Sequence, residues 1–201
     1  MTQRLPLFAL LATLAACSQA PAEAPSVTDS AWALDPAASS LTYVSIKADE
    51  LAEINSFEKL SGGVTAAGEA NVEIDLASVS TGIDIRDERM REVFFVVADN
   101  PTASVTAQID PAAFSGLAVG ESTTTELEGT LTLKGIEAPF QSEVRVTRAA
   151  SDRVIAASTD PVIVEARTLE LLDGLAQLQE LAGLPSITPV VPVTFSLTFE
   201  R

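Results

Sequence analysis

The chain has 201 residues, 47% of them hydrophobic, and a formal net charge of −16 from 12 basic and 28 acidic side chains. This length predicts one domain, or two at most. Because it contains no histidine and one cysteine, the sequence excludes histidine-dependent catalysis, His-ligated metals, a cysteine zinc cluster and an intramolecular disulfide. The acidic balance argues against nucleic acid as a partner, since phosphates require a basic surface.

The first residues have the form of a secretory signal. Arg4 precedes an apolar run at 5–16 that is too short to span a bilayer. The sequence LAAC at 14–17 resembles a bacterial lipobox, so we expect Cys17 to be the lipidated first residue of the mature protein. Ordinary secretion with an incidental Cys17 is the alternative. Ser18, where an aspartate would favour the inner membrane, favours the outer membrane.

Residues 17–30 are rich in Ala, Pro and Ser and have no periodic apolar face, which is typical of a tether. We therefore expect a signal peptide at 1–16, a lipidated cysteine with a flexible tether at 17–30, and a folded domain at 31–201. Together these segments predict a periplasmic protein that a lipid anchor holds on a membrane, with the outer membrane favoured.

Beyond the tether, apolar and polar residues alternate with period two. Val72 and Ile74, for example, alternate with Asn71 and Glu73. The alternation predicts eight strands, at 40–47, 57–65, 68–76, 102–110, 123–134, 139–148, 152–166 and 190–200. Eight strands, each with one dry and one wet face, predict a sandwich or a barrel.

Two segments have helical patterns instead. Residues 84–95 are highly charged and place Asp87 and Arg91 at i, i+4 spacing, which is typical of a solvated helix with ion pairs. Residues 168–184 carry an apolar stripe along one face, made up of Leu171, Leu175 and Leu178. Because this helix lies between the last two predicted strands, we expect it to form a lid over something that those strands enclose.

The sequence offers no catalytic motif and no metal site. Lys47 and Lys134 lie near predicted strand ends, where either could be a desolvated nucleophile, although surface lysines are far commoner. Asp75 and Asp110 lack the clustered oxygen ligands of a calcium loop. An apolar interior remains, and an eight-stranded barrel can be either filled or hollow.

Seven segments, in their order from Trp32 to Phe199, resemble the YceI-like family of periplasmic, lipocalin-like proteins linked to polyisoprenoid binding. They are WALDPAASSLTY (32–43), SFEKLSG (56–62), IDLASVSTG (74–82), IRDERMREVFF (85–95), NPTASV (100–105), LEGTLTLKG (127–135) and VPVTFSLTF (191–199). The resemblance implies an all-β fold, an eight-stranded antiparallel lipocalin-like barrel with a capping helix. Many relatives have histidines near Lys47 and Lys134, and whether the two lysines replace contacts to a ligand headgroup stays open.

The resemblance also implies a long apolar ligand in the barrel, and the inward residues of the strands and the helix are expected to contact it. These are Tyr43, Phe57, Leu60, Val72, Ile74, Val105, Ile109, Leu131, Leu133, Phe140, Val144, Leu171, Leu175, Leu178, Phe195 and Leu197. Many other inward positions hold alanine or glycine. Small residues leave space, which favours a hollow barrel.

Three functions follow as alternatives. The first is an envelope lipoprotein that binds or carries a polyisoprenoid or an isoprenoid quinone, with no cofactor other than this lipid. The second is a structural or partner-binding module whose barrel is filled, and the third is an enzyme that acts on such a lipid. The expected partners are the lipid and the membrane, and the sequence leaves the oligomeric state open, a homodimer included.

Overall fold

Eleven strands join into one antiparallel sheet in residues 26–201, the part of the chain that the structure, a computed structural model, describes. The strands are β1 (Trp32–Lys47), β2 (Leu51–Phe57), β3 (Leu60–Val64), β4 (Glu69–Asp75), β5 (Val79–Ser80), β6 (Thr102–Gln108), β7 (Ser122–Leu133), β8 (Ile136–Ala150), β9 (Arg153–Ser158), β10 (Val162–Glu165) and β11 (Val190–Glu200). The predicted signal peptide and Cys17 lie outside the described residues.

Eight of these strands close into a barrel. Their order is β1-β3-β4-β6-β7-β8-β9-β11, and β11 pairs again with β1. The remaining strands β2, β5 and β10 lengthen the wall at one end, where β2 pairs with β1 and β10 pairs with β11. The predicted eight-stranded antiparallel barrel is therefore confirmed.

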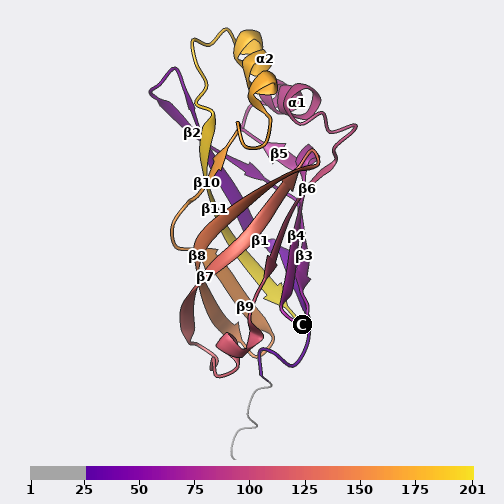
Figure 1. Ribbon diagram of the computed structural model, residues 1–201, viewed down its shortest axis with the longest axis vertical. Coiled ribbons are helices and arrows are strands. Elements are labelled where there is room, and N and C mark those ends of the chain that lie inside the picture. Colours follow the sequence, from indigo (N-terminus) through magenta and orange to yellow (C-terminus); the bar gives the residue numbers. More distant parts are fainter. Residues whose placement is uncertain (1–25) are drawn as a thin grey trace, which may run out of the picture.

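The helices lie together at that same end of the barrel (Figure 1). They are α1 (Asp84–Arg89), which continues into a π-helical turn η2 (Met90–Phe94), and α2 (Leu172–Ala182). Two short 3-10 turns, η1 (Leu76–Ser78) and η3 (Pro111–Phe114), connect strands. No helix in residues 26–201 is both long enough and apolar enough to cross a membrane.

The opposite end of the barrel is closed by packed side chains. Trp32 is buried there, and its indole Nε1 donates a hydrogen bond of 2.8 Å to the carbonyl oxygen of Val27. The guanidinium of Arg201 lies 4.4 Å from the centre of the Trp32 ring and donates a hydrogen bond to the carbonyl oxygen of Ser26. The last part of the predicted tether, 26–30, thus contacts the barrel at this closed end.

Besides the two-residue strand β5, which no predicted strand covers, the strand prediction is wrong in three places, each for a physical reason. β1 begins at Trp32 instead of residue 40, since its pairing with β11 shifts register between Asp35 and Ser40 and obscures the alternation. The predicted strand 152–166 divides into β9 and β10 around Pro161, which cannot donate to the sheet. The missed strand β2 has polar residues on its inner face and Ile54, 76% exposed, on its outer face, the reverse of the expected pattern.

Candidate functional site

The barrel encloses a cavity of about 1030 Å³ that extends to the end covered by the helices. This volume is at the top of the range of roughly 300–1,000 Å³ for small-molecule pockets. Every residue predicted to contact a ligand lines the cavity except Leu60. Leu60 begins β3, where it pairs with Ile74 and is buried without reaching the cavity surface.

Small side chains make room for the cavity. Ala70, Ala103, Ala107 and Ala156 all line it. Gly129 of β7 has a different role, because a Cβ atom there would lie 2.5 Å from the ring of Phe140. Phe140 of β8 pairs with Gly129. Because Gly129 has no Cβ atom, the ring of Phe140 can lie directly over the backbone of β7 at this position. Phe140, which also lines the cavity, thus packs on the backbone of β7 at Gly129.

Aromatic rings form a continuous row near the helix end. The centres of the Tyr43 and Phe57 rings are 5.8 Å apart, and so are the centres of the Phe57 and Phe95 rings. Phe95 in turn makes an edge-to-face contact of 5.0 Å with Phe94. All four rings line the cavity, so the row joins β1 and β2 to the π-helical turn η2 through contacts that aromatic pairs prefer.

Helix α2 covers the cavity with its leucine face. Leu171, Leu175 and Leu178 line the cavity, as the helical spacing of the sequence predicts. The helix packs closely on η2 because Gly174 has no side chain: a Cβ atom there would lie 3.3 Å from Phe94 Cδ2. It ends at Gly183, whose φ of 63° is the left-handed conformation that glycine favours.

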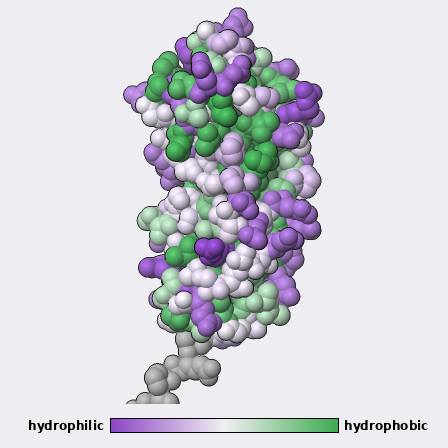
Figure 2. All heavy atoms as spheres, turned by 90° about the vertical axis from the view of Figure 1, so that its left-hand side faces the viewer, coloured by the Kyte–Doolittle hydropathy of each residue, from purple (hydrophilic) through white to green (hydrophobic). Residues whose placement is uncertain are grey.

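Apolar side chains are exposed around the same end. Among the described residues, the exposed large hydrophobic side chains other than Val119 belong to β2, β10, α2 and the start of α1. They are Leu51, Ile54, Ile83, Ile85, Ile163 and Leu181. Hydrophobic residues also gather in the upper half of the face drawn in Figure 2. Clustered exposed apolar surface is typical of a site that meets another molecule.

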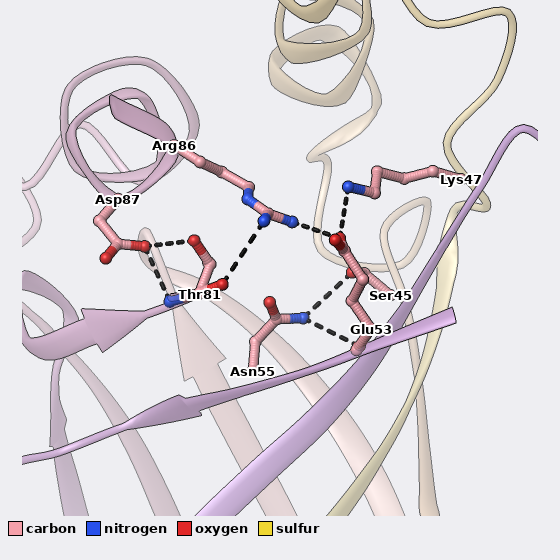
Figure 3. A network of polar contacts seen from close by, with 7 residues as sticks. All are labelled: Ser45, Lys47, Glu53, Asn55, Thr81, Arg86 and Asp87. Atoms are coloured by element: carbon pink, nitrogen blue, oxygen red, sulfur yellow. Dashed lines mark hydrogen bonds and ion pairs between the residues drawn. The ribbon is translucent and has the colours of Figure 1, made fainter. Parts of the chain in front are cut away.

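A cluster of polar side chains lies at the cavity end beneath α1 (Figure 3). It consists of Ser45, Lys47, Glu53, Asn55, Thr81, Arg86 and Asp87. Of these residues, the sequence indicates Lys47 as a possible nucleophile and predicts a solvated helix for the segment with Arg86 and Asp87. Ser45 could have been found as well, because the inward phase of Leu41 and Tyr43 continues at Ser45 and Lys47. Glu53 and Asn55 join them only through the pairing of β2 with β1, and no such period reaches Thr81, Arg86 or Asp87.

Glu53 is the centre of this cluster. Its carboxylate forms ion pairs with Lys47 and Arg86. Burial acts to raise the pKa of the Glu53 carboxyl, but hydrogen bonds from Lys47 and Arg86 outweigh it and hold that pKa below its usual value of 4.5. Asp87 is bound separately, because the amide N–H of Thr81 donates to its carboxylate at 2.8 Å. The two cations and the two anions thus balance.

The charged segment 84–95 is only partly the solvated helix that its sequence predicts. Arg86 and Asp87 turn toward the barrel, whereas Asp84 and Glu88 are exposed.

Lys134 differs from Lys47, since it is exposed in the tight β7–β8 turn, with a φ of 53°, and does not line the cavity. Residues 26–201 contain no group of three acidic side chains that could hold a metal.

Comparisons with known proteins agree with this architecture. Residues 32–199 match the family described as YceI-like domain. A polyisoprenoid binding domain from Saccharophagus degradans is 40% identical, with a TM-score of 0.83 over 86% of this chain and 99% of that one. BcnA of Burkholderia cenocepacia is 19% identical, with a TM-score of 0.63 over 82% and 98% of the two chains.

The YCEI protein of Campylobacter jejuni is 14% identical, with a TM-score of 0.53 over 73% of this chain and 84% of that one. No curated protein matches the sequence. The family match extends from the first residue of β1 nearly to the end of β11, and so includes every strand of the barrel and both helices above it. The chain therefore belongs to the YceI-like family.

Proposed function

We propose that this protein binds a long apolar lipid, a polyisoprenoid or an isoprenoid quinone, in the barrel cavity. The observation that carries the proposal is the cavity itself, about 1030 Å³ inside a wall of inward aliphatic and aromatic side chains. A hydrocarbon tail placed there gains about 25 cal/mol for each Å² of apolar surface removed from water. The 40% identity to a polyisoprenoid binding domain supports the same class of ligand.

Binding accounts for the site better than the alternatives do. A filled barrel would have no need of small inward residues such as Ala107 and Ala156, which both line the cavity. In the polar cluster, Lys47 and Arg86 both form ion pairs with the carboxylate of Glu53, so these charged groups are held by one another. The protein on this proposal holds or carries its lipid and leaves it chemically unchanged.

Organic extraction of purified protein, followed by mass spectrometry, tests the proposal. We expect one lipid of polyisoprenoid mass per chain. Ala156→Phe fills the cavity from β9 and should abolish lipid recovery, whereas Ala157→Phe, at the next position on the same strand and outside the cavity lining, should retain it. Equal recovery from both variants, or none from the wild type, would contradict lipid binding in this cavity.

We propose further that a lipid on Cys17 holds the protein at a membrane of the cell envelope. The chain enters the barrel at its closed end, away from α1 and α2 (Figure 1). Residues 17–25 span at most about 30 Å when fully extended, whereas β1, with 16 residues, runs roughly 50 Å along its axis. An anchored barrel would therefore present its helix end to the space away from its own membrane.

A further inference from the structure

Asn55 holds a buried polar atom that the protein leaves without a partner. The residue is 3% exposed and lines the cavity. Its Nδ2 donates hydrogen bonds of 3.0 Å to Ser45 Oγ and 3.2 Å to the carbonyl oxygen of Glu53. Since a carbonyl oxygen only accepts, the second bond fixes which side of the amide carries nitrogen. The opposite atom, Oδ1, accepts no hydrogen bond from the described residues.

The neighbour of Asn55 across the sheet is Tyr43. The two residues pair directly in the β1–β2 register, and both line the cavity. Burial, followed by the charge of Asp87, raises the pKa of the Tyr43 hydroxyl well above its usual value of 10, and Arg86 opposes this only in part. The hydroxyl therefore stays protonated and can donate. Side by side, the pair offers one donor and one acceptor.

The nearby charges do not favour an anion. Lys47 and Arg86 both bind the carboxylate of Glu53, and Arg86 also donates to the carbonyl oxygen of Thr81 at 3.4 Å. The charge of Asp87 lies beside them. A phosphate group would have to displace Glu53 from both cations, or remain close to two carboxylates. A neutral headgroup meets neither cost.

We propose that the polar end of the bound lipid is a neutral hydroxyl, as in a polyprenol or a quinol, that donates to Asn55 Oδ1 and accepts from Tyr43. This inference rests on the proposed function. An oxidised quinone has acceptors only, so it could use Tyr43 but would leave Asn55 Oδ1 unpaired in a dry site, which is unfavourable. The hydrocarbon tail then extends from this pair toward the closed end of the barrel.

Three probes with one tail test the headgroup: geranylgeraniol, its methyl ether and geranylgeranyl phosphate. Their dissociation constants are measured on delipidated protein by displacement of a fluorescent apolar probe. We expect the alcohol to bind at least tenfold more tightly than the ether and the phosphate. Similar constants for alcohol and ether, or tightest binding of the phosphate, would overturn the inference and leave lipid binding intact. Failure of all three to bind would overturn lipid binding as well.

Variants separate the two hydrogen bonds. Asn55→Leu removes the acceptor and should bring the alcohol to the level of the ether, with the ether unchanged. Tyr43→Phe removes the donor, which both probes use, and should weaken both while keeping their ratio. Asn71→Leu, the same change at an exposed position of β4, should keep the preference of the wild type. If Asn55→Leu fails to fold, the wild-type comparison of alcohol and ether decides alone, and a persistent preference in a folded Asn55→Leu overturns the inference.

Discussion

Glu53 of β2 forms an ion pair with Arg86 of α1 and thereby links the β1–β2 hairpin to the helix above the cavity. The pKa of Glu53 is lowered in the folded protein, so the unfolded chain takes up a proton first as the pH falls below about 4.5. Stability from this group is present above that pH and is lost as the pH falls through the lower folded-state pKa.

Glu53→Gln should therefore lower the free energy of unfolding at pH 7 by on the order of 1–3 kcal/mol, as expected for hydrogen bonds to charged groups. In this variant the free energy of unfolding should also fall less steeply with pH below pH 4.5 than in the wild type. Thermal unfolding from pH 3 to pH 7 measures both effects. Glu200→Gln is the matched control, because the Glu200–Arg153 pair is exposed and solvent screening should leave it with little effect on stability. If the free energy of unfolding fell equally steeply below pH 4.5 in Glu53→Gln and in the wild type, this role of Glu53 would be contradicted.

Cys17→Ser tests the lipid anchor. Without the thiol, the lipid cannot be attached, and we expect the variant to remain uncleaved or to be released as a soluble protein. Membrane fractionation and intact mass distinguish these outcomes from the wild type, which should sediment with the outer membrane and carry acyl mass. A mature Cys17→Ser protein that still sediments with the outer membrane would show that the lipobox interpretation is wrong.

The sequence predicts a strand of this fold well only where the apolar residues of that strand face into the barrel. Strands such as β4 and β6 carry their apolar residues inward, so the pattern locates them closely. In β2 the inner residues Glu53 and Asn55 are polar while Ile54 points outward, and a rule that places apolar residues inside misses the strand. Nothing local marks the reversal, which arises because β2 faces a polar cluster.

The candidate site likewise has a part that the sequence predicts, the apolar lining, and a part that it does not, the polar cluster. Its apolar lining could be predicted, because inward positions follow from the period of each strand, and only Leu60 falls outside the cavity. The polar cluster could not, since it joins β1, β2 and the start of α1 from positions as far apart as Ser45 and Asp87. Their meeting depends on the β2–β5 pairing, which brings Thr81 and the helix after it over the end of β2.

Phe195 tests whether the barrel is hollow around β11. Its side chain is half-buried and lines the cavity, so Phe195→Ala should cost less than about 2 kcal/mol in delipidated protein. In a filled core the same change costs about 3–5 kcal/mol. Leu60→Ala is the comparison, because Leu60 is buried away from the cavity and should cost about 2–5 kcal/mol. Denaturant unfolding of the two variants measures the difference, and a larger loss at Phe195 would support a filled barrel.

Leu175→Glu tests whether α2 is a lid. Leu175 lines the cavity from the inner face of the helix, so the variant places a carboxylate against hydrocarbon in a dry site, where an unpaired charge is strongly disfavoured. Because covering elements open at lower free energy than the strands beneath them, we expect α2 to detach or the lipid to leave while the barrel stays folded. Lipid occupancy by mass spectrometry should fall sharply, and the melting temperature of delipidated protein should change by only a few degrees.

Gln177→Glu provides the control for charge, since Gln177 is exposed on the same helix and its variant should keep full occupancy. Two outcomes would contradict the lid. Normal occupancy in Leu175→Glu would mean that the inner face of α2 does not contact the lipid. Global unfolding of Leu175→Glu would mean that the helix is part of the core, held there by contacts such as that of Gly174 with Phe94, and that release of the lipid must proceed through another part of the wall.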